Sequence, residues 1–446
     1  MSSLLTTLKS IATTDNARLT GTVSRVTGLV AEARGLALPV GSFCRILPRS
    51  SGVEPIEAEV IGFDDERTLL VPFERLEGVS PGDPVLFEGE EPMVGVSEGL
   101  LGRVIDGRGR PIDHKGPLGC EECWPIDGRP VPAMVRQRVD SPIQTGVRAI
   151  DSLLTVGRGQ RLGIFAGSGV GKSMLLGMIA RSTSIPIRVI ALVGERGREV
   201  RDFIERDLGP AGMERTVVVV ATSDDPPVLR LRAAKVATSI AEWFRSRGDD
   251  VLLLMDSITR VALAQRELGL SANEPPTTRA FPPSVFSLLP RLLERAGPGE
   301  KGSITSFYTV LVEGDDEQDP IGDAVRGFLD GHIWLSRRWA NRGHYPAIDV
   351  VSSVSRVMPD IIDVDHKMAA RETVADLARC AEAHDLVQLG AYVRGVDLRT
   401  DAALDRLPQI EALLRQEADE STRFEDSVRQ LREIQAPEPR TTRGGL

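Results

Sequence analysis

Residues 162–173 read LGIFAGSGVGKS, an apolar run followed by a glycine-rich turn that ends in a lysine and a serine. The apolar run, Leu162 to Phe165, predicts a buried strand, and Met174 to Arg181 predicts a helix. A strand, a glycine-rich turn and a helix in this order are typical of a phosphate-binding loop. In such a loop the glycines let backbone N–H groups face phosphate oxygens, and the start of the helix adds partial positive charge. We therefore predict a nucleotide site here.

ATP and Mg²⁺ are the predicted ligands of this loop. The Lys172 ammonium would reach the β and γ phosphates, and the Ser173 hydroxyl would bind Mg²⁺. Ala166 stands where the strict pattern has glycine, and we expect this change to be tolerated because the glycines nearest the phosphates are present. The predicted nucleotide contacts are Ala166, Gly167, Ser168, Gly169, Val170, Gly171, Lys172 and Ser173.

A second candidate site residue is Asp256, which ends the apolar run Val251 to Met255. Ligands of open parallel sheets bind at the carboxyl ends of the strands, so this carboxylate would lie near the phosphates and orient Mg²⁺, usually through water. Taken alone, Asp256 fits equally well as the N-cap of a helix from Ser257 to Leu268. Its combination with the phosphate-binding loop favours the metal role.

The third candidate is Glu195, which closely follows the apolar run Val189 to Val193. Hydrolysis needs a carboxylate near the γ phosphate to polarise and align the attacking water, and one such base contributes about 10²–10⁴-fold. We therefore predict Glu195 as the catalytic carboxylate. The structural alternative is a surface ion pair with Arg198 or Arg201 in the following helix.

The remaining sequence divides into parts by its patterns. Short stretches rich in Val, Leu, Ile and Thr, separated by Gly, Pro and Asp turns, predict a small β-barrel over residues 18–90. Residues 91–365 contain uninterrupted apolar runs between helical stretches, which predicts an α/β core whose parallel sheet is covered on both faces. Ala, Leu, Glu and Arg at helical spacing predict a helical domain over residues 366–446.

Residues 1–17 predict a short amphipathic helix. Its apolar residues fall on one helical face: Leu4, Leu5, Leu8 and Ile11. This face would pack on its own domain, or else dock on a partner or a membrane. Lys9 is the only base of the segment, so electrostatic attraction to anionic lipid would be small.

Composition argues against several classes of protein. The chain has 446 residues, with 54 Lys and Arg against 64 Asp and Glu, and its net charge of -10 argues against a dedicated nucleic-acid binder. No apolar run approaches the roughly 20 residues that span a bilayer, and no secretion signal is recognised, so we expect a soluble protein that is not secreted.

The cysteines predict no metal or redox site. Cys120 and Cys123 form a C-x-x-C without the second pair of a zinc ribbon, and we expect reduced thiols.

Longer strings resemble the flagellum-specific and virulence-type secretion ATPases, which are relatives of rotary ATP synthase subunits. The strings are RLGIFAGSGVGKS, GERGREV, LLLMDSITRVALAQRELGL, EPPTTRAFPPSVFSLLPRLLERAG, GSITSFYTVLVEGDDEQDPIGD, DGHIWLSRR and HYPAIDVVSSVSRVM. Ala166 is similar to what this branch uses at the first loop position, and the stretch LLGRVIDGRGRPID resembles the same superfamily. The resemblance implies a RecA-like P-loop NTPase core between a small β-barrel and C-terminal helices.

The resemblance also implies roles for individual residues. Glu195 matches the family's catalytic glutamate and is followed, as in the family, by Arg196. Arg356 in SVSR matches an arginine finger that reaches into the neighbouring subunit's nucleotide site; from its position alone it would be a surface arginine after a strand. Tyr345 in HYPA matches a position whose ring packs on adenine in the rotary relatives, and a core or interface tyrosine is the alternative.

Because Lys172, Glu195 and Arg356 lie on one chain, identical subunits could complete one another's sites, and the resemblance implies a homohexameric ring. The barrels would form a crown. The C-terminal helices would face the export gate, the stalk and regulator proteins and chaperone-bound cargo. The expected function is an ATP-hydrolysing motor that unfolds and delivers export substrates, in the cytoplasm and peripheral to the inner membrane, with the flagellar system favoured. Arg260, one turn after Asp256, is expected to brace the site.

Four alternatives share much of this pattern. The virulence-type secretion ATPase differs from the flagellar one only in fine detail. A catalytic rotary ATP synthase subunit would carry an acidic rotor-gripping motif, and we find no such run between residues 366 and 430. A noncatalytic nucleotide-binding ring subunit is disfavoured by Glu195. A hexameric RNA translocase would need exposed aromatics and bases in its barrel, which residues 18–90 scarcely provide.

Overall fold

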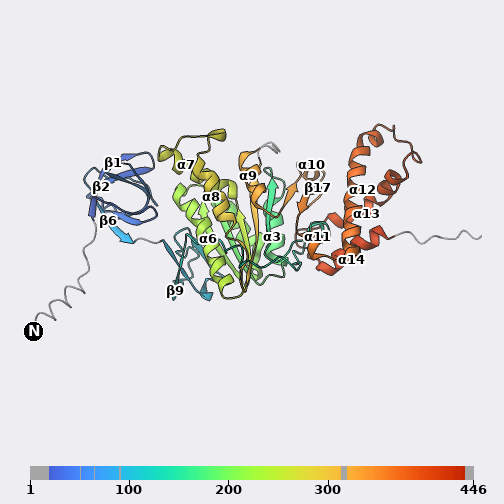
Figure 1. The fold of residues 1–446 in the computed structure, drawn as a ribbon, viewed down its shortest axis with the longest axis horizontal. Helices are drawn as coiled ribbons and strands as arrows, with labels where there is room; N and C mark the ends of the chain where they lie inside the picture. The colour runs from blue at the N-terminus through green and yellow to red at the C-terminus, as the bar shows by residue number, and fades with distance from the viewer. Residues whose placement is uncertain (1–19, 51, 65, 90–91, 313–318, 437–446) are drawn as a thin grey trace, which may run out of the picture.

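The structure is a computed structural model that describes residues 20–50, 52–64, 66–89, 92–312 and 319–436. The predicted helix over residues 1–17 lies outside this range. The described chain forms three parts in a row: a β-barrel at one end, an α/β core in the middle and a helical domain at the other end (Figure 1). This order agrees with the predicted fold class.

Six strands close the barrel in the order β1-β2-β5-β4-β3-β6. Their bounds are β1 Thr20–Thr27, β2 Val30–Arg34, β3 Phe43–Ile46, β4 Ile56–Asp64, β5 Arg67–Pro72 and β6 Pro84–Gly89. Alternate residues point inward and are buried, among them Val23, Ile46 and Leu70. Closure leaves no unpaired sheet edge, because each of the six strands has two neighbours.

The central sheet has the strand order β17-β16-β10-β15-β13-β11-β12-β8. Its strands are β8 Val104–Asp106, β10 Arg161–Ala166, β11 Ile187–Glu195, β12 Thr216–Thr222, β13 Asp250–Asp256, β15 Ser303–Leu311, β16 Gly331–Leu335 and β17 Ile348–Ser355. Along this path all pairings are parallel except that of β17, which runs antiparallel to β16. The carboxyl ends of the parallel strands therefore share one edge, whereas β17 ends at the opposite edge.

Helices cover both faces of this sheet, which explains its uninterrupted apolar strands. Successive strand residues face opposite sides: Val189 packs in one core cluster and Ile190 in the other. Helices α6 Pro227–Ser246, α7 Ile258–Ser271 and α8 Pro283–Leu293 cover the first side, and α3 Lys172–Ser182 covers the second. Both faces of the strands β10, β11, β12, β13 and β15 are thus dry, as predicted from the runs.

The shorter elements complete the core. They are β7 Met93–Val96, β9 Glu122–Pro125, α2 Arg148–Leu153, α4 Gly197–Asp202, a π-helix Phe203–Leu208, α5 Gly209–Met213, β14 Gly297–Pro298, α9 Pro320–Phe328, α10 Arg337–Asn341 and α11 Met358–Ile361. Strands β7 and β9 pair with each other and pack against α6 of the core.

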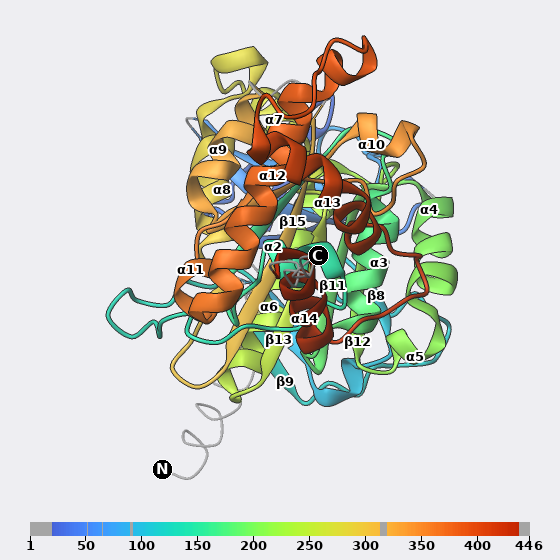
Figure 2. The same ribbon diagram turned by 90° about the vertical axis from the view of Figure 1, so that its right-hand side faces the viewer.

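The helical domain consists of α12 Val364–Gln388, α13 Leu398–Leu414 and α14 Phe424–Gln435, which lie in front of the sheet in Figure 2. The buried Arg148 of α2 joins this domain to the core. Its Nε donates to the Leu413 carbonyl at 3.0 Å, and its main-chain N–H donates to Gln416 Oε1 at 2.8 Å. Among the described helices, none is both long and apolar enough to cross a membrane.

A buried ion pair fixes the end of α8 against α6. Arg295 Nη2 and Nε donate to the two carboxylate oxygens of Glu242 at 2.6 and 3.0 Å, and these side chains are only 4% and 5% exposed. Two parallel bonds between a guanidinium and a carboxylate combine charge with fixed geometry. The pair therefore holds α6 and α8 in register on one face of the sheet.

We expect Glu242→Ala to destabilise the core, because Arg295 would keep its buried charge without the carboxylate. Breaking a buried pair in this way costs about 3–5 kcal/mol of unfolding free energy. Urea unfolding followed by tryptophan fluorescence would measure it. Glu205→Ala is the control, since its pair with Arg201 is exposed and contributes about 0–1 kcal/mol. Equal losses in both variants would contradict the expectation.

Candidate active site

The predicted phosphate-binding loop joins β10 to α3 at the carboxyl edge of the sheet. Gly169 and Gly171 have φ angles of 77° and 90°, a backbone conformation that glycine adopts without strain. Gly171 is the N-cap of α3, so the helix begins at Lys172, two residues before the predicted Met174. Ala166 and Gly167 are buried, while Ser168 and Ser173 are exposed. The middle of the glycine-rich loop and the first turn of α3 are therefore accessible to a ligand.

Three residues predicted from separate motifs converge behind this loop. Lys172 Nζ lies 2.5 Å from Asp256 Oδ1 and 3.3 Å from Glu195 Oε1. The convergence follows from the sheet, because β11 and β13 are parallel neighbours in which Leu192 pairs with Asp256. Their carboxylates are therefore delivered at the same edge as the loop.

The electrostatics of the cluster keep Lys172 charged. Burial by itself would lower the pKa of Lys172, but the carboxylates of Asp256 and Glu195 outweigh burial and raise it. The three side chains are 5–13% exposed. A shielded ammonium between two carboxylates leaves about one excess negative charge, which suits a site for a divalent cation next to phosphates.

The structural alternatives for Asp256 and Glu195 are not adopted. The N-cap of α7 is Ser257, whose Oγ accepts the Arg260 N–H, so Asp256 does not cap that helix. The ion pairs proposed for Glu195 do not form, because Arg198 contacts Asp202 and Arg201 contacts Glu205.

The oxygen ligands at this edge fit Mg²⁺. The Asp256 carboxylate and the Ser173 hydroxyl are hard donors that Mg²⁺ prefers, and this ion typically takes only one or two protein carboxylates beside water and phosphate oxygens. Within the described residues no cluster of three or more His, Cys, Asp or Glu forms a complete metal cage. Mg²⁺ would therefore be held jointly by this edge and by a bound triphosphate.

Two further residues in the cluster are ones that the sequence analysis missed or placed only loosely. Thr309 of β15 donates its hydroxyl to Asp256 Oδ1 at 2.7 Å; the signal for it was a hydroxyl within an apolar run. The side chain of Arg260 packs over Gly194, where a Cβ would lie 2.9 Å from the Arg260 Cβ. Arg260 thus lies against the backbone just before Glu195, and Gly194 has to be a glycine there.

Tyr345 lies next to the phosphate-binding loop, whereas the Arg196 side chain points into solvent. The ring of Tyr345 lies beside Gly171, where an added Cβ would be 3.2 Å from its Cε1. The Tyr345 carbonyl accepts the Gln416 N–H at 2.9 Å, which ties this position to the helical domain. In contrast, the Arg196 side chain is 82% exposed and contacts Glu199, so the structure does not bring it into the cluster.

Arg356 lies on the opposite edge of the sheet. It follows β17, where Ser355 pairs with Gly331 at the start of β16. From the register of β10 and β16, Gly331 is level with Leu162, about 13 Å along the strand from Ala166. Arg356 therefore lies far from the phosphate-binding loop of its own chain, and as an exposed residue it can contact another molecule.

Comparison with known proteins identifies the family. Residues 146–355 match the ATP synthase alpha/beta family, nucleotide-binding domain; residues 23–89 match the beta-barrel domain of that family; residues 362–433 match the T3SS EscN ATPase C-terminal domain. The flagellum-specific ATP synthase of Pseudomonas aeruginosa is 50% identical over 406 residues, which are 90% of each chain. The chain belongs to the type III export ATPase family.

Relatives of this export ATPase also come from the virulence-type branch of the family. The type 3 secretion system ATPase of Xanthomonas euvesicatoria is 49% identical over 97% of this chain and 98% of its own. The assembled ATPase EscN from the type III secretion system of enteropathogenic E. coli has 44% identity and a TM-score of 0.88, over 93% of this chain and 100% of that chain. These similarities confirm the predicted fold class and the ATPase activity.

We expect Gly171→Ala to weaken nucleotide binding by the export ATPase. A residue with a Cβ pays about 1–2 kcal/mol for a left-handed backbone, and here the Cβ would also crowd Tyr345. The free loop should therefore relax out of this conformation, and restoring it on binding should weaken affinity about tenfold in titrations with a fluorescent ATP analogue. Gly197→Ala is the control, because no described atom lies within 4 Å of a Cβ at that position. Unchanged affinity in Gly171→Ala would refute the expectation.

Proposed function

We propose that this chain is the ATP-hydrolysing motor of a type III export apparatus and works as a homohexameric ring in which each copy supplies Arg356 to its neighbour. One observation carries the proposal: Lys172, Glu195 and Asp256 converge within 3.3 Å, while Arg356 lies at the other edge of the same sheet. An interface that joins the two edges head to tail closes into a ring when its rotation allows.

Each residue has a defined part in hydrolysis. Lys172 leaves its carboxylate partners for the β and γ phosphate oxygens, and the backbone N–H groups of residues 167–172 hold the phosphate chain. Ser173 and Asp256 would hold Mg²⁺, which supplies charge neutralisation between the phosphates. Glu195, freed from Lys172, polarises and aligns the attacking water. Tyr345 would pack on adenine, and Arg196 would contact the nucleotide from the rim.

Arg356 of one copy would complete the nucleotide site of the neighbouring copy. The guanidinium of Arg356 would stabilise the charge that develops on the γ phosphate, an effect of about 10³–10⁵ in turnover for such arginines. Turnover then depends on contact between copies, since no copy reaches its own phosphates with this side chain. The isolated chain would bind ATP and hydrolyse it slowly.

Export partners would bind at the helical end. The solved complex of EscN includes a central stalk, EscO. In this chain the segment after α12 and the first residue of α13 carry exposed apolar side chains, with Leu389, Val396 and Leu398 each 77–81% exposed. Stalk and regulator proteins, the export gate and chaperone-bound cargo are the proposed partners here, at the cytoplasmic face of the inner membrane. The net charge of -10 gives no support to nucleic acid as a partner.

We favour the flagellar system over the virulence-type one. The strings AGSGVGKS and PPSVFSLLPRLLERAG resemble the flagellar branch, and the Pseudomonas aeruginosa and Bacillus subtilis flagellum-specific ATP synthases are both 50% identical to this chain. Deletion of the gene should abolish flagellar filaments in the source organism and leave any effector secretion intact. Loss of effector secretion with normal filaments would assign the chain to the virulence-type system.

We expect Glu195→Gln to lower turnover about 10²–10⁴-fold, because an amide cannot act as the base. ATP should stay bound, because the substitution removes no contact with the phosphates. Lys172→Ala should lose hydrolysis together with tight binding, because it removes the ammonium from the phosphates. Phosphate release and fluorescent-nucleotide titration would separate the two effects. Normal turnover in Glu195→Gln would exclude its role as base.

We expect Arg356→Ala to keep its fold and its ATP affinity but to lose the rise in specific activity with protein concentration. That rise reflects assembly, in which one copy completes the site of the next. Phosphate release measured across a dilution series would show it. Arg429→Ala, which changes an exposed arginine of α14, is the control. Wild-type turnover of Arg356→Ala at every concentration would rule out a trans-acting site.

A further inference from the structure

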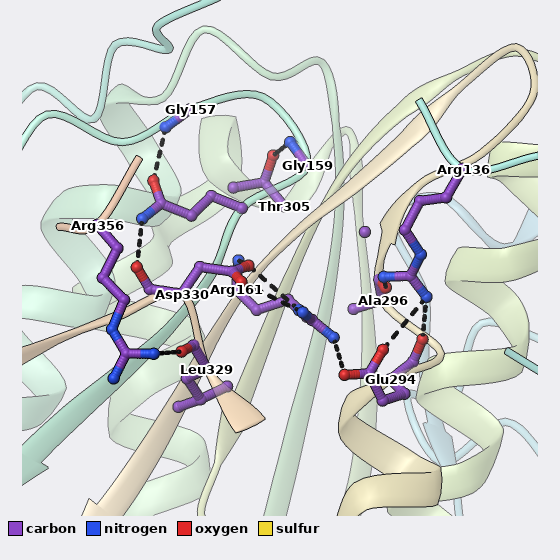
Figure 3. Close-up of polar contacts among 12 residues, drawn as sticks. Arg136, Gly157, Gly159, Arg161, Glu294, Ala296, Thr305, Leu329, Asp330 and Arg356 are labelled. Atoms are coloured by element: carbon purple, nitrogen blue, oxygen red, sulfur yellow. Dashed lines mark hydrogen bonds and ion pairs between the residues drawn. The ribbon is translucent and has the colours of Figure 1, made fainter. Parts of the chain in front are cut away.

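A charged network lies to one side of Arg356 (Figure 3). At its centre the carboxylate of Asp330, just before β16, accepts three hydrogen bonds from Arg161. Oδ2 accepts the Arg161 main-chain N–H at 3.0 Å and Nε at 3.2 Å, and Oδ1 accepts Nη2 at 3.2 Å. The Asp330 N–H returns a bond to the Arg161 carbonyl at 2.8 Å. The turn before β16 is therefore fixed to the first residue of β10.

Arg356 is attached to that same turn. Its main-chain N–H donates to the Asp330 carbonyl at 3.0 Å, and its Nη1 donates to the Leu329 carbonyl at 3.4 Å. The two adjacent carbonyls thus hold the backbone and the tip of the arginine side chain. The position of the guanidinium follows the position of this turn, and the turn is held by the Asp330 carboxylate.

Arg161 is itself held from a second side. Its Nη1 lies 2.6 Å from Glu294 Oε1, and Arg136 Nη2 donates to the Glu294 carbonyl at 2.7 Å. Burial would lower the pKa of Arg161, but Asp330 and Glu294 together raise it, so its charge is permanent. Charge-assisted bonds of this multidentate kind are about twice as strong as neutral ones and fix orientation.

The network also connects two functional sites of one copy. Arg161 begins β10, and β10 ends at Ala166, where the phosphate-binding loop starts. The strand between them is a buried, fully paired element of the sheet. The same rigid strand therefore carries the loop at one end and, through Asp330, the arginine that serves the next copy at the other end.

We propose that Asp330, clamped by Arg161, is a positioning residue for Arg356 and sets the geometry with which each copy enters its neighbour's nucleotide site. This inference rests on the proposed function, in which Arg356 acts in trans. A displacement of about 1 Å at a catalytic group can cost about 10²-fold in rate. Removing the carboxylate should therefore impair turnover without altering nucleotide affinity.

The test begins with Asp330→Asn, which keeps the shape of the side chain. It also keeps the bonds that the residue 330 main chain makes with Arg161 and Arg356. It replaces one carboxylate oxygen by an NH₂ group and removes the charge that faces Arg161. We expect kcat of the assembled protein to fall about ten- to hundredfold, with affinity for a fluorescent ATP analogue unchanged. Arg161→Lys, which keeps the charge and loses the planar fork, should shift kcat in the same direction. Asp113→Asn is the matched control, because it removes the charge from another bidentate arginine pair, with Arg103, beside β8 at the other end of the strand order.

Mixed assemblies then separate positioning from a general structural role. Asp330→Asn has an intact phosphate-binding loop and a misplaced arginine; Lys172→Ala has a defective loop and a well-placed arginine. In a random one-to-one mixture about one site in four combines the intact loop with the intact arginine, so the mixture should recover up to about a quarter of wild-type activity. Each variant alone should stay below that value, at about a tenth of wild-type activity or less. The reference mixture combines Arg356→Ala with Lys172→Ala.

The outcomes distinguish this inference from the proposed function. Recovery in both mixtures supports both. Recovery with Arg356→Ala but not with Asp330→Asn overturns the positioning role and leaves the trans-acting site standing. No recovery in the reference mixture overturns the trans-acting site and with it the inference. Loss of nucleotide binding or of the fold in Asp330→Asn, or unchanged kcat, also overturns the inference.

Discussion

The ammonium of Lys172 lies between the carboxylates of Asp256 and Glu195, and the rest of the site depends on this contact. It requires that three segments far apart in sequence end at the same edge of one sheet, which in turn requires parallel strands with dry faces. The buried positions of β11 and β13 supply those faces, and Thr309 fixes the Asp256 carboxylate from the next strand. Folding of the core and assembly of the site are therefore the same event.

Periodicity and motif spacing predicted much of this arrangement. The apolar runs identified the strands that carry Lys172, Glu195 and Asp256, because a strand buried on both faces shows no alternation. The barrel was predicted from short strands between turn residues, and closure of six strands bears this out. The helix after the loop starts two residues earlier than predicted, because Gly171 caps it in a left-handed conformation that the residue types alone do not fix.

Other features lay outside what the sequence could show. Nothing in Ile348 to Ser355 reveals that this strand runs antiparallel, because strand direction depends on pairing partners distant in the chain. Thr309 contributes a hydroxyl within an apolar run, and its significance appears only once β13 lies beside β15. Arg161 and Asp330 are 169 residues apart, and their contact depends on the register of β10 and β16. The roles of Arg356 and Tyr345 came from family resemblance and remain predictions.

The antiparallel direction of β17 bears on when the cell consumes ATP. If all eight strands on the main path were parallel, Arg356 would follow β17 at the edge that carries the phosphate-binding loop of its own chain. A single copy could then hydrolyse ATP without a neighbour. With that single strand turned around, the guanidinium emerges on the far side. Under the proposed function, a newly synthesised or dissociated copy would hydrolyse ATP only slowly, and full turnover would begin when copies assemble.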